Sequence, residues 1–129
     1  MKSNFVLVIL LSLSTICCKD SGVAIPGVLL GTYTYNGYDQ GGTLIVRGTL
    51  ILSREDTIIA GTWSFNDGRT GNLEGRMDEG NIYIDLNPGF VDNNLLLHGR
   101  FEGTMISGQW EQVGFPGVMA QGTFTAVRR

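Results

Sequence analysis

The chain contains 129 residues, of which 43% are hydrophobic, and its nine lysines and arginines are outnumbered by twelve aspartates and glutamates, giving a formal net charge of −3. This length fits a single domain, and the mildly acidic balance lacks the basic surface that nucleic-acid-binding proteins use. We therefore expect no nucleic-acid partner. The two cysteines are adjacent, Cys17 and Cys18, so no disulfide can join distant parts of the fold, and stability must come from one apolar core.

The first thirty residues have the layout of an export segment followed by a tether. Lys2 precedes a largely apolar run at residues 5–16, and the chain then turns abruptly polar. This three-part arrangement is typical of a secretory signal peptide, and the run is too short to span a bilayer as a helix. A buried N-terminal helix is the alternative. The sequence predicts a signal peptide at residues 1–17, a tether at 18–30 and a single domain at 31–129.

The stretch "LSTICCKD" resembles the lipoprotein signal of bacteria, in which the cysteine after the cleavage point receives a diacylglycerol group. The resemblance implies lipidation of Cys18, with Cys17 as the alternative acceptor. The following Lys19-Asp20 is similar to the start of lipoproteins of the Bacteroidetes group. It implies an exported protein held on a bacterial membrane, the outer membrane in particular, facing the periplasm or the cell surface. Cleavage after Ala24, which would release a freely secreted protein, is the other possibility.

Beyond residue 30 the sequence predicts β-strands throughout. Short runs of alternating polar and apolar residues are separated by turn residues such as Asn-Gly, Asp-Gly and Pro-Gly, which favour hairpins, and 19 glycines are unfavourable in helices. No connection has room for a crossover helix, so every pairing should be antiparallel. We expect an all-β, eight-stranded up-and-down meander barrel, with strands at 32–35, 43–52, 58–65, 71–77, 81–86, 95–103, 105–112 and 120–127.

The two tryptophans, Trp63 and Trp110, each follow a glycine by two residues and suggest two four-stranded repeats. Alternate residues share a face of a strand, and this places the apolar side chains and six strand glycines inside. The glycines of the two Gly-x-Trp motifs should make room for the indole rings. The distance from Gly48 to Trp63 exceeds that from Gly99 to Trp110 by four residues, which we assign to a longer hairpin loop at residues 53–57.

No arrangement of residues predicts catalysis. The only histidine, His98, is expected on the outer face, and no inward-facing Ser, Asp or Glu lies in the strands to form a nucleophile–base pair with it. The acidic residues fall at turns without the spacing of a calcium loop, and the glycine-rich stretches lack the strand-to-helix context of a phosphate loop. We expect a non-enzymatic protein with no metal and no cofactor.

A cavity for a small hydrophobic ligand is the leading functional expectation. The barrel with its Gly-x-Trp motifs and the closing "GTFTAVRR" resembles the lipocalin-like and avidin-like proteins, which implies a ligand inside the barrel; Tyr33, Tyr35, Trp63 and Trp110 would line it. An eight-stranded barrel is, however, just wide enough for side chains to fill it. The alternative is a filled core in a protein-interaction, inhibitor or structural module of the cell envelope, with the loop residues Phe90 and Phe115 presented to a partner.

Overall fold

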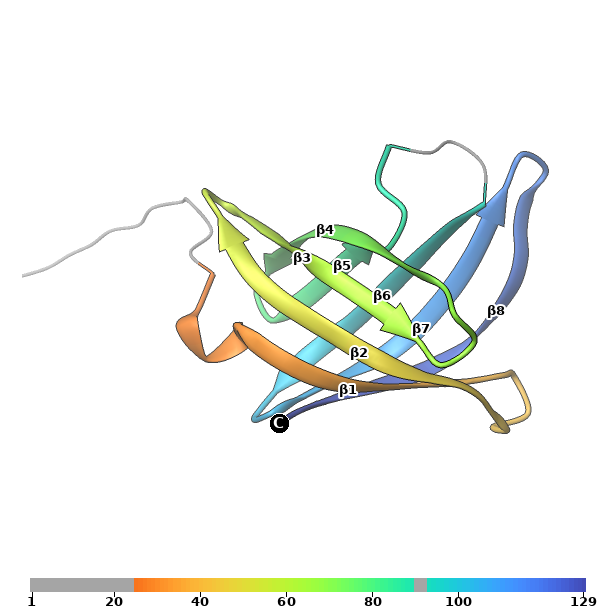
Figure 1. Cartoon of the computed structure of the whole chain (residues 1–129), viewed down its shortest axis with the longest axis horizontal. Helices are drawn as coiled ribbons and strands as arrows, with labels where there is room; N and C mark the ends of the chain where they lie inside the picture. Colours follow the sequence, from red (N-terminus) through yellow and green to blue (C-terminus); the bar gives the residue numbers. More distant parts are fainter. Residues whose placement is uncertain (1–24, 90–92) are drawn as a thin grey trace, which may run out of the picture.

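The computed structural model describes residues 25–89 and 93–129 of the chain. Eight antiparallel strands form a closed barrel in which each strand pairs with its neighbours in sequence and β8 pairs with β1 (Figure 1). A 3₁₀ turn, η1, precedes β1. The elements are η1 Gly27–Leu29, β1 Gly31–Tyr38, β2 Leu44–Glu55, β3 Ile58–Phe65, β4 Thr70–Asp78, β5 Asn81–Asp85, β6 Asn94–Glu102, β7 Met105–Gly114 and β8 Gly117–Arg128. The predicted all-β, eight-stranded up-and-down barrel is confirmed.

The alternation of side chains builds the core. Along β1, β3 and β5 every second residue is buried, apart from the inward-facing glycines Gly31 and Gly61, which are half-buried. One face of each strand turns toward the barrel axis and the other toward solvent. Among the described residues all buried side chains of the core are hydrophobic, and no polar or charged residue is buried with them. The predicted inner face is therefore correct at nearly every position. Leu44 is an exception, since it lies at the first residue of β2 and is partly exposed.

Two-residue turns connect β2 to β3 and β6 to β7. Glu55 pairs with Ile58 in the first hairpin, and Glu102 pairs with Met105 in the second. The predicted longer loop at residues 53–57 is wrong: residues 53–55 belong to β2, and Asp56 takes a positive φ of 59° in the tight turn. Trp63 pairs with Leu50 and Trp110 pairs with Leu97, so the two hairpins are equally long from the tryptophan to its partner. The difference of four residues arises because Gly48 and Gly99 are not equivalent positions: Gly48 pairs with Phe65, whereas Gly99 pairs with Gly108.

One end of the barrel is closed by the segment before β1, which lies at the left in Figure 1. Ile25 and Leu29 are buried and belong to the core cluster. The hydroxyl of Tyr33 donates a hydrogen bond of 2.6 Å to the Leu29 carbonyl, and the guanidinium of Arg128 donates to the Val28 carbonyl. The packed unit thus includes residues 25–30, which the sequence analysis assigned to the tether. We call this the plugged end, and the opposite end, with the turns that follow β1, β3, β5 and β7, the open end.

The predicted signal peptide and both candidate lipidation sites, Cys17 and Cys18, lie outside the described residues. Phe90 does too. Within the residues that the structure describes, no helix has the length and apolar character needed to cross a membrane.

Candidate functional site

The four residues predicted to line a ligand cavity all lie in the core of the barrel. Tyr33 and Tyr35 are 0% and 1% exposed, and Trp63 and Trp110 are 9% and 8% exposed. Tyr33 lies against the plugged end, where it meets Leu29. The two tryptophans lie toward the open end, on β3 and β7. The structure therefore spreads these residues along the interior and does not gather them around one opening.

Aromatic rings fill the middle of the barrel. Tyr35 is stacked on Phe65 at 5.0 Å and on Phe124 at 5.6 Å between ring centroids, and Trp63 packs against Phe65 at 4.7 Å. Offset stacking at these distances stabilises the core beyond the burial of apolar area. Burial raises the pKa of Tyr35 well above its ordinary value, with the positive charge of Arg69 opposing part of the effect. These stacked rings occupy the part of the interior for which the sequence analysis left open a ligand cavity or a filled core.

The two tryptophans occupy equivalent places in the two halves of the barrel. Trp63 on β3 pairs with Gly71 on β4, and its Nε1 donates a hydrogen bond of 2.6 Å to the carbonyl of Leu86, just after β5. Trp110 on β7 pairs with Gly122 on β8, and its Nε1 donates at 2.8 Å to the carbonyl of Tyr38, at the end of β1. Each indole thus crosses one strand and satisfies a carbonyl on the next.

The glycines that make room for the indoles are those paired with the tryptophans. A Cβ at Gly71 would lie 3.1 Å from Nε1 of Trp63, and one at Gly122 would lie 2.7 Å from Nε1 of Trp110. The glycines of the Gly-x-Trp motifs have another role, because a Cβ at Gly61 or Gly108 would collide with a backbone carbonyl of the neighbouring strand. The predicted role of the motif glycines is therefore wrong, and they allow close approach between strands instead.

A hollow of about 600 Å³ at the open end is bordered by Trp110. It lies between the β1–β2 loop, which contributes Asp39, Gln40 and Gly41, and the first residues of β8. Its apolar walls include side chains that are more than half exposed: Ile45, Val118 and Met119. Phe115 is 92% exposed in the adjacent β7–β8 turn. Scattered exposed apolar residues are ordinary, but four at one end of a small barrel form a candidate interaction surface.

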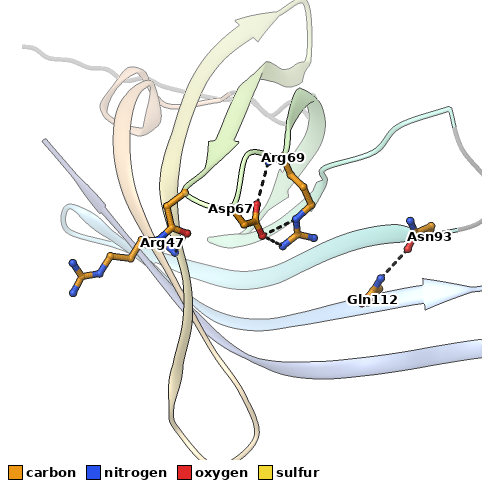
Figure 2. Close-up of polar contacts among 6 residues, drawn as sticks. Arg47, Asp67, Arg69, Asn93 and Gln112 are labelled. Carbon is orange, nitrogen blue, oxygen red and sulfur yellow. Dashed lines mark hydrogen bonds and ion pairs between the residues drawn. The ribbon is translucent and has the colours of Figure 1, made fainter.

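A second hollow, of about 400 Å³, lies beside Trp63 and has a lining of both polar and apolar side chains. Arg69 forms an ion pair of 2.8 Å with Asp67, and Gln112 donates a hydrogen bond of 2.8 Å to the side-chain oxygen of Asn93, as Figure 2 shows. Hydrogen bonds from Arg69 lower the pKa of the Asp67 carboxyl. The charge of Arg69 is thus already neutralised, and the amides bond to each other.

On the outer wall, Tyr83 is sandwiched between two side chains of its neighbouring strands. Its ring stacks on His98 at 4.4 Å between centroids, and the guanidinium carbon of Arg76 lies 4.5 Å from its ring centroid. The three residues follow one another in register across β4, β5 and β6, and they border a shallow groove of about 570 Å³. The sequence analysis placed His98 on this face but did not find its partner, since that required the register of β5.

In residues 25–89 and 93–129, no three His, Cys, Asp or Glu side chains come together as a possible metal-ligand set. In the groove of the outer wall, Glu74 lies directly opposite Asp85. His98 stands beside them in the groove but is held against Tyr83. We therefore assign no catalytic or metal-binding role to this groove.

Comparison with known proteins gives the fold alone. No protein-family model matches the chain, and no curated protein matches it. Among solved structures, a redesigned β-barrel is similar to it with a TM-score of 0.50 and 15% sequence identity, over 79% of this chain and 92% of the other. A likeness at this identity supports the eight-stranded barrel architecture and carries no function with it.

Proposed function

We propose that the chain is a non-catalytic lipoprotein of the bacterial cell envelope that binds other proteins through the open end of its barrel. The observation that carries this proposal is the cluster of exposed apolar side chains there, Ile45, Phe115, Val118 and Met119. The core is occupied by stacked aromatic side chains, so binding takes place on the outside. Apolar patches of this kind are typical of protein-interaction surfaces.

The proposed anchor suits this use of the open end. Lipidated Cys18 would be seven residues before Ile25, which is buried at the plugged end, and seven extended residues span at most about 23–25 Å. The lipid would therefore hold the barrel by its plugged end and leave the opposite end accessible. The Cys18→Ser variant should lose its attachment to membranes; a variant that still partitions into detergent would contradict the choice of cysteine.

A photo-crosslinking amino acid at Val118 tests the interaction in cells that export the protein. Val118 is 55% exposed at the open end, so a bound protein should be captured there. The same amino acid at Glu102, which is exposed at the plugged end, is the matched control. Adducts that form at position 118 and not at position 102 support the proposal. No adduct at position 118 would refute it.

The second candidate function is binding of a small hydrophobic ligand, now at the open end and not within the core. It is favoured by the size of the hollow beside Trp110, about 600 Å³, which is within the range of small-molecule sites. A Trp63→Phe variant leaves Trp110 as the only tryptophan and thus as the reporter. A shift or quenching of its fluorescence by lipids or small aromatic compounds would support this candidate, whereas an unchanged spectrum across the panel would leave protein binding as the function.

A further inference from the structure

Apolar side chains are exposed at the plugged end too, where the end of β8, marked C in Figure 1, lies beside η1. Val28 of η1 is 61% exposed, and Met105 and Val127 are 40% and 42% exposed. Met105 and Val127 lie opposite each other in the pairing of β7 with β8. The next residue, Arg128, donates a hydrogen bond to the Val28 carbonyl. The three apolar side chains therefore belong to one part of the rim.

Two arginines at the end of β8 add positive charge to this part of the rim. Arg128 donates to the Val28 carbonyl, and Arg129 donates to the hydroxyl oxygens of Thr34 and Thr49. Within the described residues these bonds occupy one donor of Arg128 and two of Arg129, whereas a guanidinium has five. Both side chains thus retain donors for a further acceptor. We call this part of the rim the anchor face; it consists of Val28, Met105, Val127, Arg128 and Arg129.

The three hairpin turns of the plugged end are acidic. Exposed carboxylates lie in or beside the β2–β3, β4–β5 and β6–β7 turns: Glu55, Asp56, Asp78, Glu79 and Glu102. Arg54 and Arg100, in the strands next to these turns, offset them only in part. Glu102 pairs with Met105 on the side away from Val127, so it borders the anchor face without interrupting it. A surface that carries phosphate groups would meet the anchor face more favourably than the turns.

The position of the proposed lipid brings the plugged end close to a bilayer. From Cys18 to Ile25, which is buried at this end, seven residues reach at most about 23–25 Å. The longest strands, β2 and β8, have twelve residues each and rise about 28–32 Å along the axis of a barrel with the usual strand tilt. The barrel is thus longer than the reach of the lipidated segment, and the bilayer lies nearer to the plugged end than to the open end.

Resting on the proposed function, which places a lipid on Cys18, we propose that the anchor face docks on the bilayer that holds this lipid. Its apolar side chains enter the boundary between headgroups and acyl chains, and Arg128 and Arg129 bind headgroup phosphates. Interfacial binding of this kind increases with the apolar area buried and with attraction to the headgroups, and guanidinium groups pair well with phosphate.

The lipid makes a small contact sufficient for docking. Three apolar side chains bind a bilayer weakly by themselves, but a short connection holds a second binding site at an effective concentration of about millimolar. Docking through the anchor face tilts the barrel toward β1 and β8 and lifts the acidic turns away from the headgroups. The open end then points away from the membrane in a defined orientation.

A fluorophore on single cysteines tests the docking. The mature protein would begin at lipidated Cys18 and has no further cysteine, so an introduced thiol can be labelled alone. In vesicles of phosphatidylethanolamine and phosphatidylglycerol, a polarity-sensitive dye at Val28→Cys or Met105→Cys should shift its emission to the blue. Asp78→Cys, beside an acidic turn, and Phe115→Cys, at the open end, are exposed controls that should show no shift. Equal emission at all four positions would overturn the proposal.

A charge in the anchor face provides the second test. Val28→Glu should abolish the blue shift of a dye at Met105→Cys, whereas Phe115→Glu at the open end should preserve it. Both positions are exposed, so urea unfolding should be unchanged, and the loss of the shift then reports the loss of docking and not of the fold. A shift that persists in Val28→Glu would overturn the assignment of Val28 to the docked surface.

Failure of the docking can be distinguished from failure of the proposed function. If the crosslinker at Val118 captures proteins but the dye shows no shift at positions 28 and 105, docking is refuted and protein binding stands. If the dye shifts and Val118 captures nothing, docking stands and protein binding is refuted. A Cys18→Ser protein that remains attached to membranes would refute the lipid anchor on which the docking depends.

Discussion

Substitution of Gly122 by alanine tests how the tryptophans are held. The added methyl would lie 2.7 Å from Nε1 of Trp110 and would also collide with the Tyr38 carbonyl, to which that nitrogen donates. The indole and the carbonyl must separate, so the variant suffers overpacking, which costs about 1–3 kcal/mol, and loses a hydrogen bond worth about 0.5–1.5 kcal/mol. We expect the free energy of unfolding to fall by about 1.5–4.5 kcal/mol, the sum of these two effects.

Urea unfolding followed by tryptophan fluorescence measures this loss, and two other glycines provide controls. Gly71 faces Trp63 in the equivalent place, but a methyl there would lie 3.1 Å from Nε1, so Gly71→Ala should cost less. At Gly27 a methyl would meet nothing within 4 Å, so Gly27→Ala should have little effect. The expected order of destabilisation is Gly122, Gly71, Gly27. If Gly122→Ala were as stable as Gly27→Ala, the proposal that Gly122 leaves the space occupied by the Trp110 indole would be refuted.

Two further predictions concern the plugged end and the core. Leu29→Ala should lower the stability by about 2–4 kcal/mol because a buried leucine is removed from the plug, whereas Val28→Ala, at an exposed neighbouring position, should change it little in the same urea titration. Burial raises the pKa of Tyr35 in the folded state, so its contribution to stability is complete below the ordinary tyrosine pKa of about 10 and is lost as the pH rises above it. Between pH 8 and pH 11 the free energy of unfolding should fall less for Tyr35→Phe than for the unchanged protein. An equal fall in both proteins would contradict a raised pKa of Tyr35.

The faces of the strands could be predicted from the sequence because the side-chain period of a strand is two residues. Once one face is buried, a shift by one residue would expose the whole apolar set, and the apolar pattern from Leu50 to Phe124 therefore determines which side faces inward. The structure bears this out with a core that contains no buried polar residue among those described. Leu44 departs from the pattern because it is at the end of a strand, where alternation continues but the barrel no longer encloses the side chain.

The register could not be predicted from the glycines, because glycine has no side chain and serves different purposes at different places. Gly99 lies directly opposite Gly108, whereas Gly48 lies opposite Phe65. The two glycines are therefore not equivalent positions, and their sequence distances to Trp63 and Trp110 cannot be compared. Register follows from the turns, and the Asp56-Thr57 turn has none of the usual hairpin dipeptides. Gly71 and Gly122 can be identified as the glycines opposite the two tryptophans only once the turn residues, and with them the register, are known.

The plug was missed because its turn residues suggested a tether. Pro26 and Gly27 are typical of linkers, but they stand between two apolar residues, Ile25 and Leu29, that are four positions apart. Pro26 is extended and the 3₁₀ turn covers only residues 27–29, so the chain direction and not a helical period brings Ile25 and Leu29 to the core. A single turn is too short to be predicted with periodicity alone, and its Val28 carbonyl is bound by Arg128, which lies 100 residues away in sequence.

The two ends of the barrel differ in how the core is covered and in which side chains bond to the backbone carbonyls, and this difference is relevant to the proposed function. At the plugged end, buried apolar side chains cover the core, and side chains of β1 and β8 satisfy the carbonyls of the plug. At the open end, the tryptophans donate hydrogen bonds to the carbonyls of Tyr38 and Leu86. Apolar side chains around Trp110 nevertheless remain exposed to solvent. These exposed side chains are the ones through which we propose that the open end contacts another protein.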